Sequence, residues 1–276
     1  MTVFLKKLTS SLGPLVGGES LAWLEQHSDG EKVLEARVAT RLNLREARRQ
    51  KNLEAIFALA AEELQEEVSD DPVFEDWLAL YVDLAGDVAD ATAQQVWARL
   101  LALQIAVPDA VFKRTLLHLH SMDLWELNAF AEFCSFAFAF ESGWRFVFEE
   151  NITRPETWGY TRGNDYTQHF INTGLLSPEV SRLRMGLSKG GMRIRYYEKE
   201  YGLAPDSTES TGGLAFPDAE FGYRRFTVTG QQLTKALRAQ TYYGYARNVI
   251  SRLATEHKVE FQWLDEEGGG TTGDET

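Results

Sequence analysis

The spacing of apolar residues changes once along this chain of 276 residues, near Ser142. Before that position apolar residues recur every three or four places, which predicts helices, and after it they often alternate, which predicts strands among helices. We therefore expect a mainly α fold with a C-terminal α+β part. The expected divisions are a helical bundle over 1–141, an α+β domain over 142–264 and a disordered tail over 265–276.

The helical half contains one long pattern, Glu31–Val68, whose charges are polarised. Six basic residues and one acid lie between Arg37 and Lys51, and six acids without a base lie between Glu62 and Asp71. The arginines that fall on one stripe of this helix are Arg37, Arg41, Arg45, Arg48 and Arg49. We expect a solvated stripe, or one that pairs with the acidic stretch of a second copy in a homo-oligomer. Nucleic-acid contact is the weaker alternative.

A basic stretch, Ser181–Arg195, has no acid in a chain of formal net charge −13. Its cations are Arg182, Arg184, Lys189, Arg193 and Arg195. Alternation on both sides of Lys189-Gly190 predicts a β hairpin with its four arginines on one face. In that hairpin Arg184 lies opposite Arg195, and facing like charges are unfavourable. We therefore expect an anion over this face: nucleic acid or another anionic ligand, a protein partner, or carboxylates of the same chain.

Composition excludes several classes of protein. The one cysteine, Cys134, excludes an internal disulfide framework and a multi-cysteine zinc site, and it suits a reducing cytoplasm. No apolar run reaches the ~20 residues that span a bilayer. Residues 1–24 carry two lysines and a short apolar stretch broken by glycines, so a signal peptide is not expected, and membrane-surface contact stays an alternative. The overall acidity disfavours non-specific DNA binding.

We expect no catalytic residue, metal or cofactor. The sequence contains no phosphate-binding loop, no nucleophile elbow and no H-E-x-x-H helix. His118 and His120 stand two places apart, which puts them on different faces of a helix. Trp77 and Trp97 are expected in the core, since aromatic residues at helical spacing usually pack there. A distributed active site stays open.

Separated motifs of the helical half resemble those of an uncharacterised bacterial family. In chain order they are RRQKNLEAI at 48–56, DW at 76–77, QQVWARLLA at 94–102, Pro108 and RTL at 114–116. The resemblance covers roughly 45–140. This region is also similar to the alpha-type abortive-infection proteins, which share an L-W-A-x-L-L-A helix. The resemblance implies bacterial antiviral defence as a context, and it implies no catalytic residue.

The C-terminal part resembles a winged helix. A helix end, INTGLL at 171–176, precedes the basic stretch, and a strand-to-helix junction, FTVTGQQL at 226–233, follows it. In the winged-helix pattern these two motifs flank the β wing. The resemblance implies that Val228 points inward, and Thr229 is suited to cap the following helix.

The function that we expect is a non-enzymatic binding or adaptor protein of bacterial antiviral defence. It would act in the cytoplasm and dock a protein partner or an anionic ligand through the basic hairpin. One alternative is a winged-helix transcriptional regulator that reads bases with Gln168, His169 and Asn172. The other is a membrane-acting abortive-infection effector that uses residues 1–24.

Overall fold

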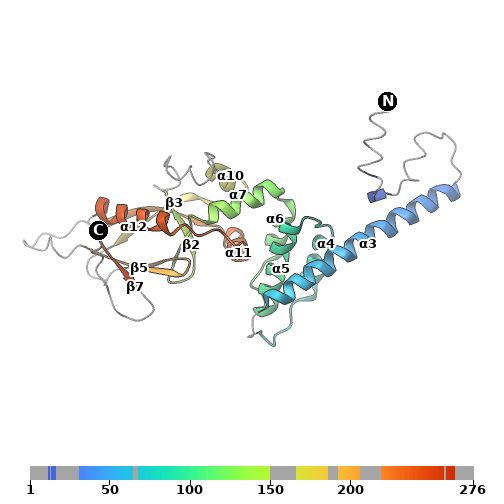
Figure 1. The fold of residues 1–276 in the computed structure, drawn as a ribbon, viewed down its shortest axis with the longest axis horizontal. Coiled ribbons are helices and arrows are strands. Elements are labelled where there is room, and N and C mark those ends of the chain that lie inside the picture. Colours follow the sequence, from blue (N-terminus) through green and yellow to red (C-terminus); the bar gives the residue numbers. More distant parts are fainter. Residues whose placement is uncertain are drawn as a thin grey trace, which may run out of the picture. The chain divides into compact units, whose positions relative to one another are not determined.

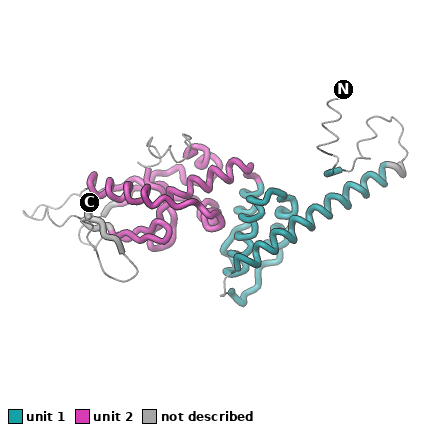
Figure 2. The backbone as a smooth tube through the Cα atoms, in the orientation of Figure 1, with its two compact units in different colours: residues 1–120 teal, residues 121–276 magenta. Residues whose placement is uncertain are grey.

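The computed structural model describes residues 12, 14–16, 31–64, 68–149, 166–185, 192–205, 219–257 and 259–264 (Figure 1). The protein is mainly α with a C-terminal α+β part, which confirms the expected fold class. The chain divides into two compact units, residues 1–120 and 121–276 (Figure 2).

Unit 1 is built from helices around an aromatic core. In chain order they are α3 (Glu31–Glu63), α4 (Glu75–Ala85), α5 (Ala91–Ala106) and α6 (Lys113–Ser121), the last of which ends at the border. Trp77 stacks on Tyr81, whose ring meets Trp97 edge-on at 5.4 Å. Both tryptophans are buried, as expected. Asp90 caps α5, since its side chain accepts hydrogen bonds from the first turn.

The two halves of α3 lie in different surroundings. In the C-terminal half Leu53 and Ile56 are buried. In the N-terminal half Leu34, Val38 and Leu42 are 52%, 38% and 46% exposed. Figure 1 shows the reason, because α4, α5 and α6 gather beside the C-terminal half and α3 extends beyond them. The apolar pattern therefore runs along the whole of α3. Within the described residues, only its C-terminal half packs against other helices.

Unit 2 is an antiparallel sheet with helices. The helices are α7 (Leu124–Cys134), α10 (Thr167–Asn172), α11 (Val228–Ala236) and α12 (Tyr243–His257). The strands are β1 (Phe138–Phe140), β2 (Arg145–Phe148), β3 (Leu176–Met185), β4 (Met192–Tyr196), β5 (Lys199–Pro205), β6 (Ala219–Phe226) and β7 (Val259–Leu264). Their order in the sheet is β3-β6-β2-β1-β4-β5-β7.

The border between the units differs from the expected one at 141/142. Residues 121–141 belong to unit 2, because Phe130 and Phe133 of α7 pack edge-on against Phe170 and Phe226. The helix expected to reach Phe140 ends at Cys134, and the alternating Phe-Ala-Phe that follows forms β1. Alternation of large and small residues favours a strand here.

The hairpin expected around Lys189-Gly190 is wrong. β3 pairs with β6, and β4 pairs with β1 and β5, so three strands separate β3 from β4. The two-residue turn of this region is Tyr197-Glu198, between β4 and β5. Alternation in the sequence identifies strands and their faces, but it does not identify which strands pair. Lys189 lies outside the described residues.

The two motifs that resemble a winged helix meet in space. Thr227 donates a hydrogen bond from Oγ1 to Gly174 O at 2.6 Å and caps α11 by accepting from Gly230 N at 3.1 Å. The expected cap, Thr229, is wrong, and the expected inward direction of Val228 is wrong because this side chain is 45% exposed. A side chain at Gly230 would collide with the carbonyl oxygen of Leu175, so this junction requires glycine.

Candidate binding site

The arginines of β3 and β4 lie on a charged face of the sheet and are matched by acids of the same chain. The strand register places Arg182, Arg193 and Arg195 on one face. Arg182 Nη1 lies 2.6 Å from Glu220 Oε1, and Arg193 Nε lies 3.9 Å from Glu141 Oε1. The hydrogen bond to Glu220 raises the pKa of Arg182.

The backbone register adds two further cross-strand matches. Arg184 lies opposite Glu220, and Arg195 lies opposite Glu200. The like-charge contact between Arg184 and Arg195 therefore does not form. Glu141, Glu200 and Glu220 thus lie near or opposite these arginines, which supports the alternative of carboxylates of the same chain. Docking of an external anion or a partner on this face stays a prediction.

The deepest ion pair on this face was missed by sequence reasoning. Arg224 is 7% exposed, and its Nε and Nη2 contact the two oxygens of Glu149 at 3.0 and 2.8 Å. Its Nη1 donates to the carbonyls of Ser177 and Pro178. Such a bidentate pair is specific in geometry, and here it ties β6 to β3 and to the end of β2. We assign Arg224 a structural role.

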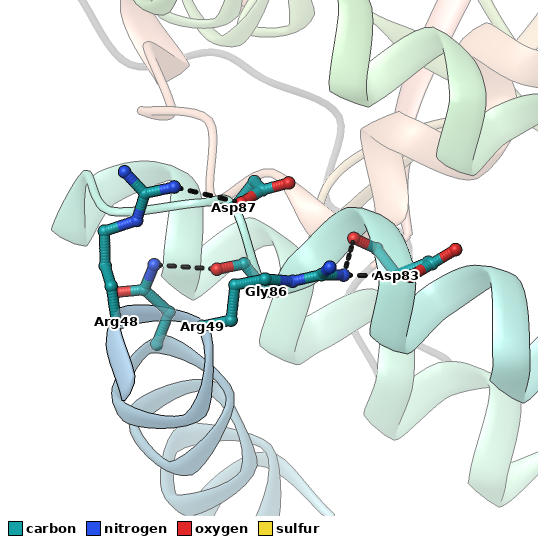
Figure 3. A network of polar contacts seen from close by, with 6 residues as sticks. Arg48, Arg49, Asp83, Gly86 and Asp87 are labelled. Atoms are coloured by element: carbon teal, nitrogen blue, oxygen red, sulfur yellow. Dashed lines mark hydrogen bonds and ion pairs between the residues drawn. The ribbon is translucent and has the colours of Figure 1, made fainter. Parts of the chain in front are cut away.

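The basic stripe of α3 is divided between two surroundings, and Figure 3 shows the contacts of Arg48 and Arg49. Arg49 Nη2 donates to Asp83 O at 2.7 Å and lies 2.9 Å from Asp83 Oδ1, and this hydrogen bond raises the pKa of Arg49. Arg48 Nη2 lies 3.2 Å from Asp87 Oδ1. Asn52 donates to Gly86 O at 2.9 Å.

These contacts satisfy carbonyl groups at the end of α4, where intrahelical partners are missing. The space is tight, since a side chain at Gly86 would approach Arg49 Nε to 2.8 Å. The RRQKN motif is therefore a structural clamp between α3 and α4. The rest of the stripe, Arg37, Arg41 and Arg45, lies on the exposed N-terminal half of α3.

An open groove lies in unit 1, at the starts of α4 and α6. Its volume is about 490 Å³. The residues that line this aromatic groove are Phe74, Glu75, Asp76, Trp77, Asp109, Val111, Phe112 and Lys113. Phe74 and Phe112 are 63% and 51% exposed, whereas Trp77 is buried and donates from Nε1 to Val111 O at 2.7 Å. Two exposed phenylalanines thus line the same groove as a buried, hydrogen-bonded tryptophan.

The rim of the aromatic groove is acidic. Glu75, Asp76 and Asp109 contribute three carboxylates, and Lys113 contributes one cation. Lys113 Nζ lies 3.4 Å from Asp76 Oδ2, which leaves the balance of the rim negative. An apolar groove with this rim is complementary to an apolar side chain flanked by positive charge.

Sequence reasoning missed the two phenylalanines. Both stand directly before a helix: Phe74 is the N-cap of α4, and Phe112 accepts the first hydrogen bonds of α6 from Thr115 N and Leu116 N. Polar residues are strongly preferred at such positions. A large aromatic residue at the starts of α4 and α6 was the signal that could have revealed the groove.

The side chains expected to read bases are engaged within unit 2. Gln168 Nε2 donates to Asn172 Oδ1 at 2.8 Å. His169 Nε2 lies 2.7 Å from Glu126 Oε1, and its ring lies 5.1 Å from that of Trp125. An acidic partner beside His169 disfavours contact with nucleic acid.

Among the described residues, no group of three His, Cys, Asp or Glu residues is arranged to hold a metal ion. No helix among them has the length and apolarity needed to cross a bilayer. Burial raises the pKa of the Cys134 thiol to about 12, so this thiol is protonated at neutral pH. Most of residues 1–24 lie outside the described residues.

The fold and the groove define a class: a two-unit protein, mainly α, with an acidic-rimmed aromatic groove in its helical unit. Residues 36–158 match a family described as "Protein of unknown function (DUF2806)". The match covers a little under half of the chain and includes the α3–α4 clamp and the groove. No curated protein and no solved structure matches the chain.

Proposed function

We propose that this protein is a non-enzymatic binding protein that docks a protein partner in the aromatic groove of unit 1. The observation that carries the proposal is the exposure of Phe74 and Phe112, at 63% and 51%, in a groove that the buried Trp77 also lines. Burial of one such aromatic ring contributes on the order of 1.5–3 kcal/mol. Two anchors in one groove have the character of an interface hot spot.

The acidic rim selects the chemistry of the partner. Glu75 and Asp109 stand beside the rings, and the one cation, Lys113, already pairs with Asp76. The partner is therefore a peptide segment with a large apolar residue between lysines or arginines. An acidic segment would meet carboxylates of its own sign, which costs several kcal/mol in an interface.

The cellular context that we propose is bacterial antiviral defence in the cytoplasm. It is supported by the stretch QQVWARLLA at 94–102, which is similar to the L-W-A-x-L-L-A helix of the alpha-type abortive-infection proteins. The test is phage plating on cells that express the protein with its neighbouring genes. Expression should lower plating efficiency, and Phe74→Ser with Phe112→Ser should restore it. Equal plating with and without the protein would contradict this context.

Peptide display against the full chain tests the docking proposal. Selected peptides should be enriched in Leu, Phe or Trp flanked by Lys or Arg, and Glu75→Lys should weaken their binding about tenfold or more. The double variant Phe74→Ser with Phe112→Ser should abolish binding, and Leu117→Ser should not change it, although Leu117 is also 51% exposed in unit 1.

Other outcomes would contradict the proposal. Selection of acidic peptides, or binding that survives loss of both phenylalanines, would show that the groove is not the docking site. Tight, salt-sensitive binding of duplex DNA would favour the transcriptional regulator. Co-sedimentation with anionic vesicles that is lost on deletion of residues 1–24 would favour the membrane effector.

A further inference from the structure

A second cavity lies in unit 2, between the start of β5 and the start of α12. Its volume is about 450 Å³, and its described lining consists of Lys199, Tyr243, Gly244 and Arg247. This volume is within the usual range for small-molecule sites. Its described lining residues all belong to unit 2 and differ from those of the aromatic groove.

The described lining is cationic. Lys199 and Arg247 supply two positive charges, and none of the described lining residues is acidic. Glu200, next to Lys199 in the chain, lies opposite Arg195 in the strand register. Because successive strand residues point to opposite faces, Glu200 points away from the face that carries Lys199. Glu200 therefore lies on the face of the sheet opposite to the cavity.

Tyrosines hold the walls of this cavity in place. Tyr196 donates from Oη to Ser135 O at 2.7 Å and accepts from Tyr242 N at 2.9 Å, which joins the β4–β5 turn to α7 and to the start of α12. Tyr197 has a φ of 53° and donates from Oη to Cys134 O at 2.7 Å. A bulky residue in the left-handed region persists only where its surroundings hold it.

Tyr243 gives the cavity a flat aromatic wall. Its ring is 42% exposed and lies 6.0 Å from the ring of Tyr196. Tyr201 is buried beneath this region, and burial raises its pKa to about 12, while the nearby charge of Arg247 acts in the opposite direction. Arg247 therefore lies close to β5, on the same side as the exposed ring.

We propose that this cavity binds a mononucleotide, with Lys199 and Arg247 contacting its phosphate and Tyr243 stacking on its base. Two cations match a phosphate dianion, and any nucleobase can stack on an aromatic ring. Among the described lining residues one is aromatic, which favours one stacked base over a strand, since strands are bound along extended basic grooves with successive aromatic residues. This site is independent of the proposed partner docking.

Calorimetric titration of the full chain with AMP, GMP, CMP and UMP tests the proposal. At least one mononucleotide should bind saturably, and adenosine and inorganic phosphate should bind more weakly. Lys199→Gln, Arg247→Gln and Tyr243→Ala should each weaken binding about tenfold or more. Arg193→Gln is the matched control, because Arg193 is an exposed cation of the same unit on the other face of the sheet, and its variant should bind as the wild type does.

A variant that fills the cavity tests the proposal even if one of the substitutions at Lys199, Arg247 or Tyr243 prevents folding. A side chain at Gly244 meets nothing within 4 Å, so Gly244→Leu should fold normally and fill the cavity. Absence of saturable binding at millimolar mononucleotide, or binding that Gly244→Leu leaves unchanged, would overturn the proposal. If inorganic phosphate bound as tightly as AMP, the base would contribute nothing to binding, and the proposed stacking on Tyr243 would be wrong. A single-stranded oligonucleotide that binds more tightly than every mononucleotide would replace the proposal with strand binding.

Discussion

At the scale of a residue, Asn52 shows how a side chain of a sequence motif joins two helices. It is 7% exposed, and its amide donates to the carbonyl of Gly86 just beyond α4. A buried carbonyl without a partner costs free energy comparable to a lost hydrogen bond. The RRQKN motif could be found in the sequence, but its partners lie more than thirty residues away, and local spacing does not identify partners at that range.

Asn52→Ala should lower the free energy of unfolding by about 1–3 kcal/mol, because the Gly86 carbonyl loses its buried donor. Urea unfolding measures the change. Gln50→Ala is the control, since Gln50 is exposed and donates a hydrogen bond to Glu54 of its own helix. An equal loss of stability in the two variants would contradict the clamp.

The buried Cys134 predicts a dependence of stability on pH. Burial raises its pKa from 9.0 to about 12 in the folded protein. Between these values the unfolded chain releases the thiol proton and the folded chain keeps it, so stability falls as the pH rises from about 9 to about 12. Urea unfolding at pH 7, 9 and 10.5 should show this fall, and Cys134→Ala should reduce it. A fall of the same size in the variant would show that the thiol does not contribute.

At the scale of elements, the sequence predicted where strands and helices lie better than it predicted which strands pair. Alternation placed strands at both ends of Ser181–Arg195, and strands are found there. The pairing was not predictable, because alternation assigns a face and each strand had several partners of matching pattern. The cap of α11 was ambiguous for a local reason: Thr227 and Thr229 both stand at the junction, and either side chain can cap a helix.

Engineered disulfides test the strand pairing in a Cys134→Ala background. Arg182→Cys with Gly222→Cys should cross-link under oxidising conditions, since these residues face each other across β3 and β6. Arg184→Cys with Arg195→Cys should not cross-link within a chain. Mass spectrometry of the digested protein distinguishes the two pairs, and a cross-link in the second pair would restore the hairpin.

The two halves of α3 predict unequal mutational costs. Ile56→Ala should lower the free energy of unfolding by about 2–5 kcal/mol because Ile56 is fully buried. Leu42→Ala should cost about 0.5 kcal/mol or less, as for other exposed positions. Thermal unfolding at several protein concentrations makes the comparison. A large cost for Leu42→Ala that grows with concentration would show that a second copy covers this half.

At the scale of the whole molecule, composition and periodicity predicted the fold class and the change in the spacing of apolar residues near Ser142. They placed the border at 142, because α7 and the following Phe-Ala-Phe are as apolar as the bundle. Packing decides the border instead, through the contacts of α7 with Phe170 and Phe226. The aromatic groove could not be predicted from the sequence either, since it is formed by two helix starts that are distant in the chain.

Truncation tests this border. Residues 121–276 should fold alone with a cooperative thermal transition, because they keep Phe130 and Phe133 over the sheet. Residues 142–276 should not, since they lack α7 and the central strand β1. Circular dichroism on heating makes the comparison. Equal cooperative transitions in the two fragments would move the border back to 142.

The central claim is that the aromatic groove seats a basic, apolar segment of a protein partner, and photo-cross-linking in living cells tests it most directly. A benzophenone amino acid would replace Phe112, and Leu117 would carry the same label as a control. We predict that position 112 cross-links to a peptide with an apolar residue beside Lys or Arg, and that Glu75→Lys removes this product. An acidic cross-linked peptide at position 112, or equal products at 112 and 117, would contradict the claim.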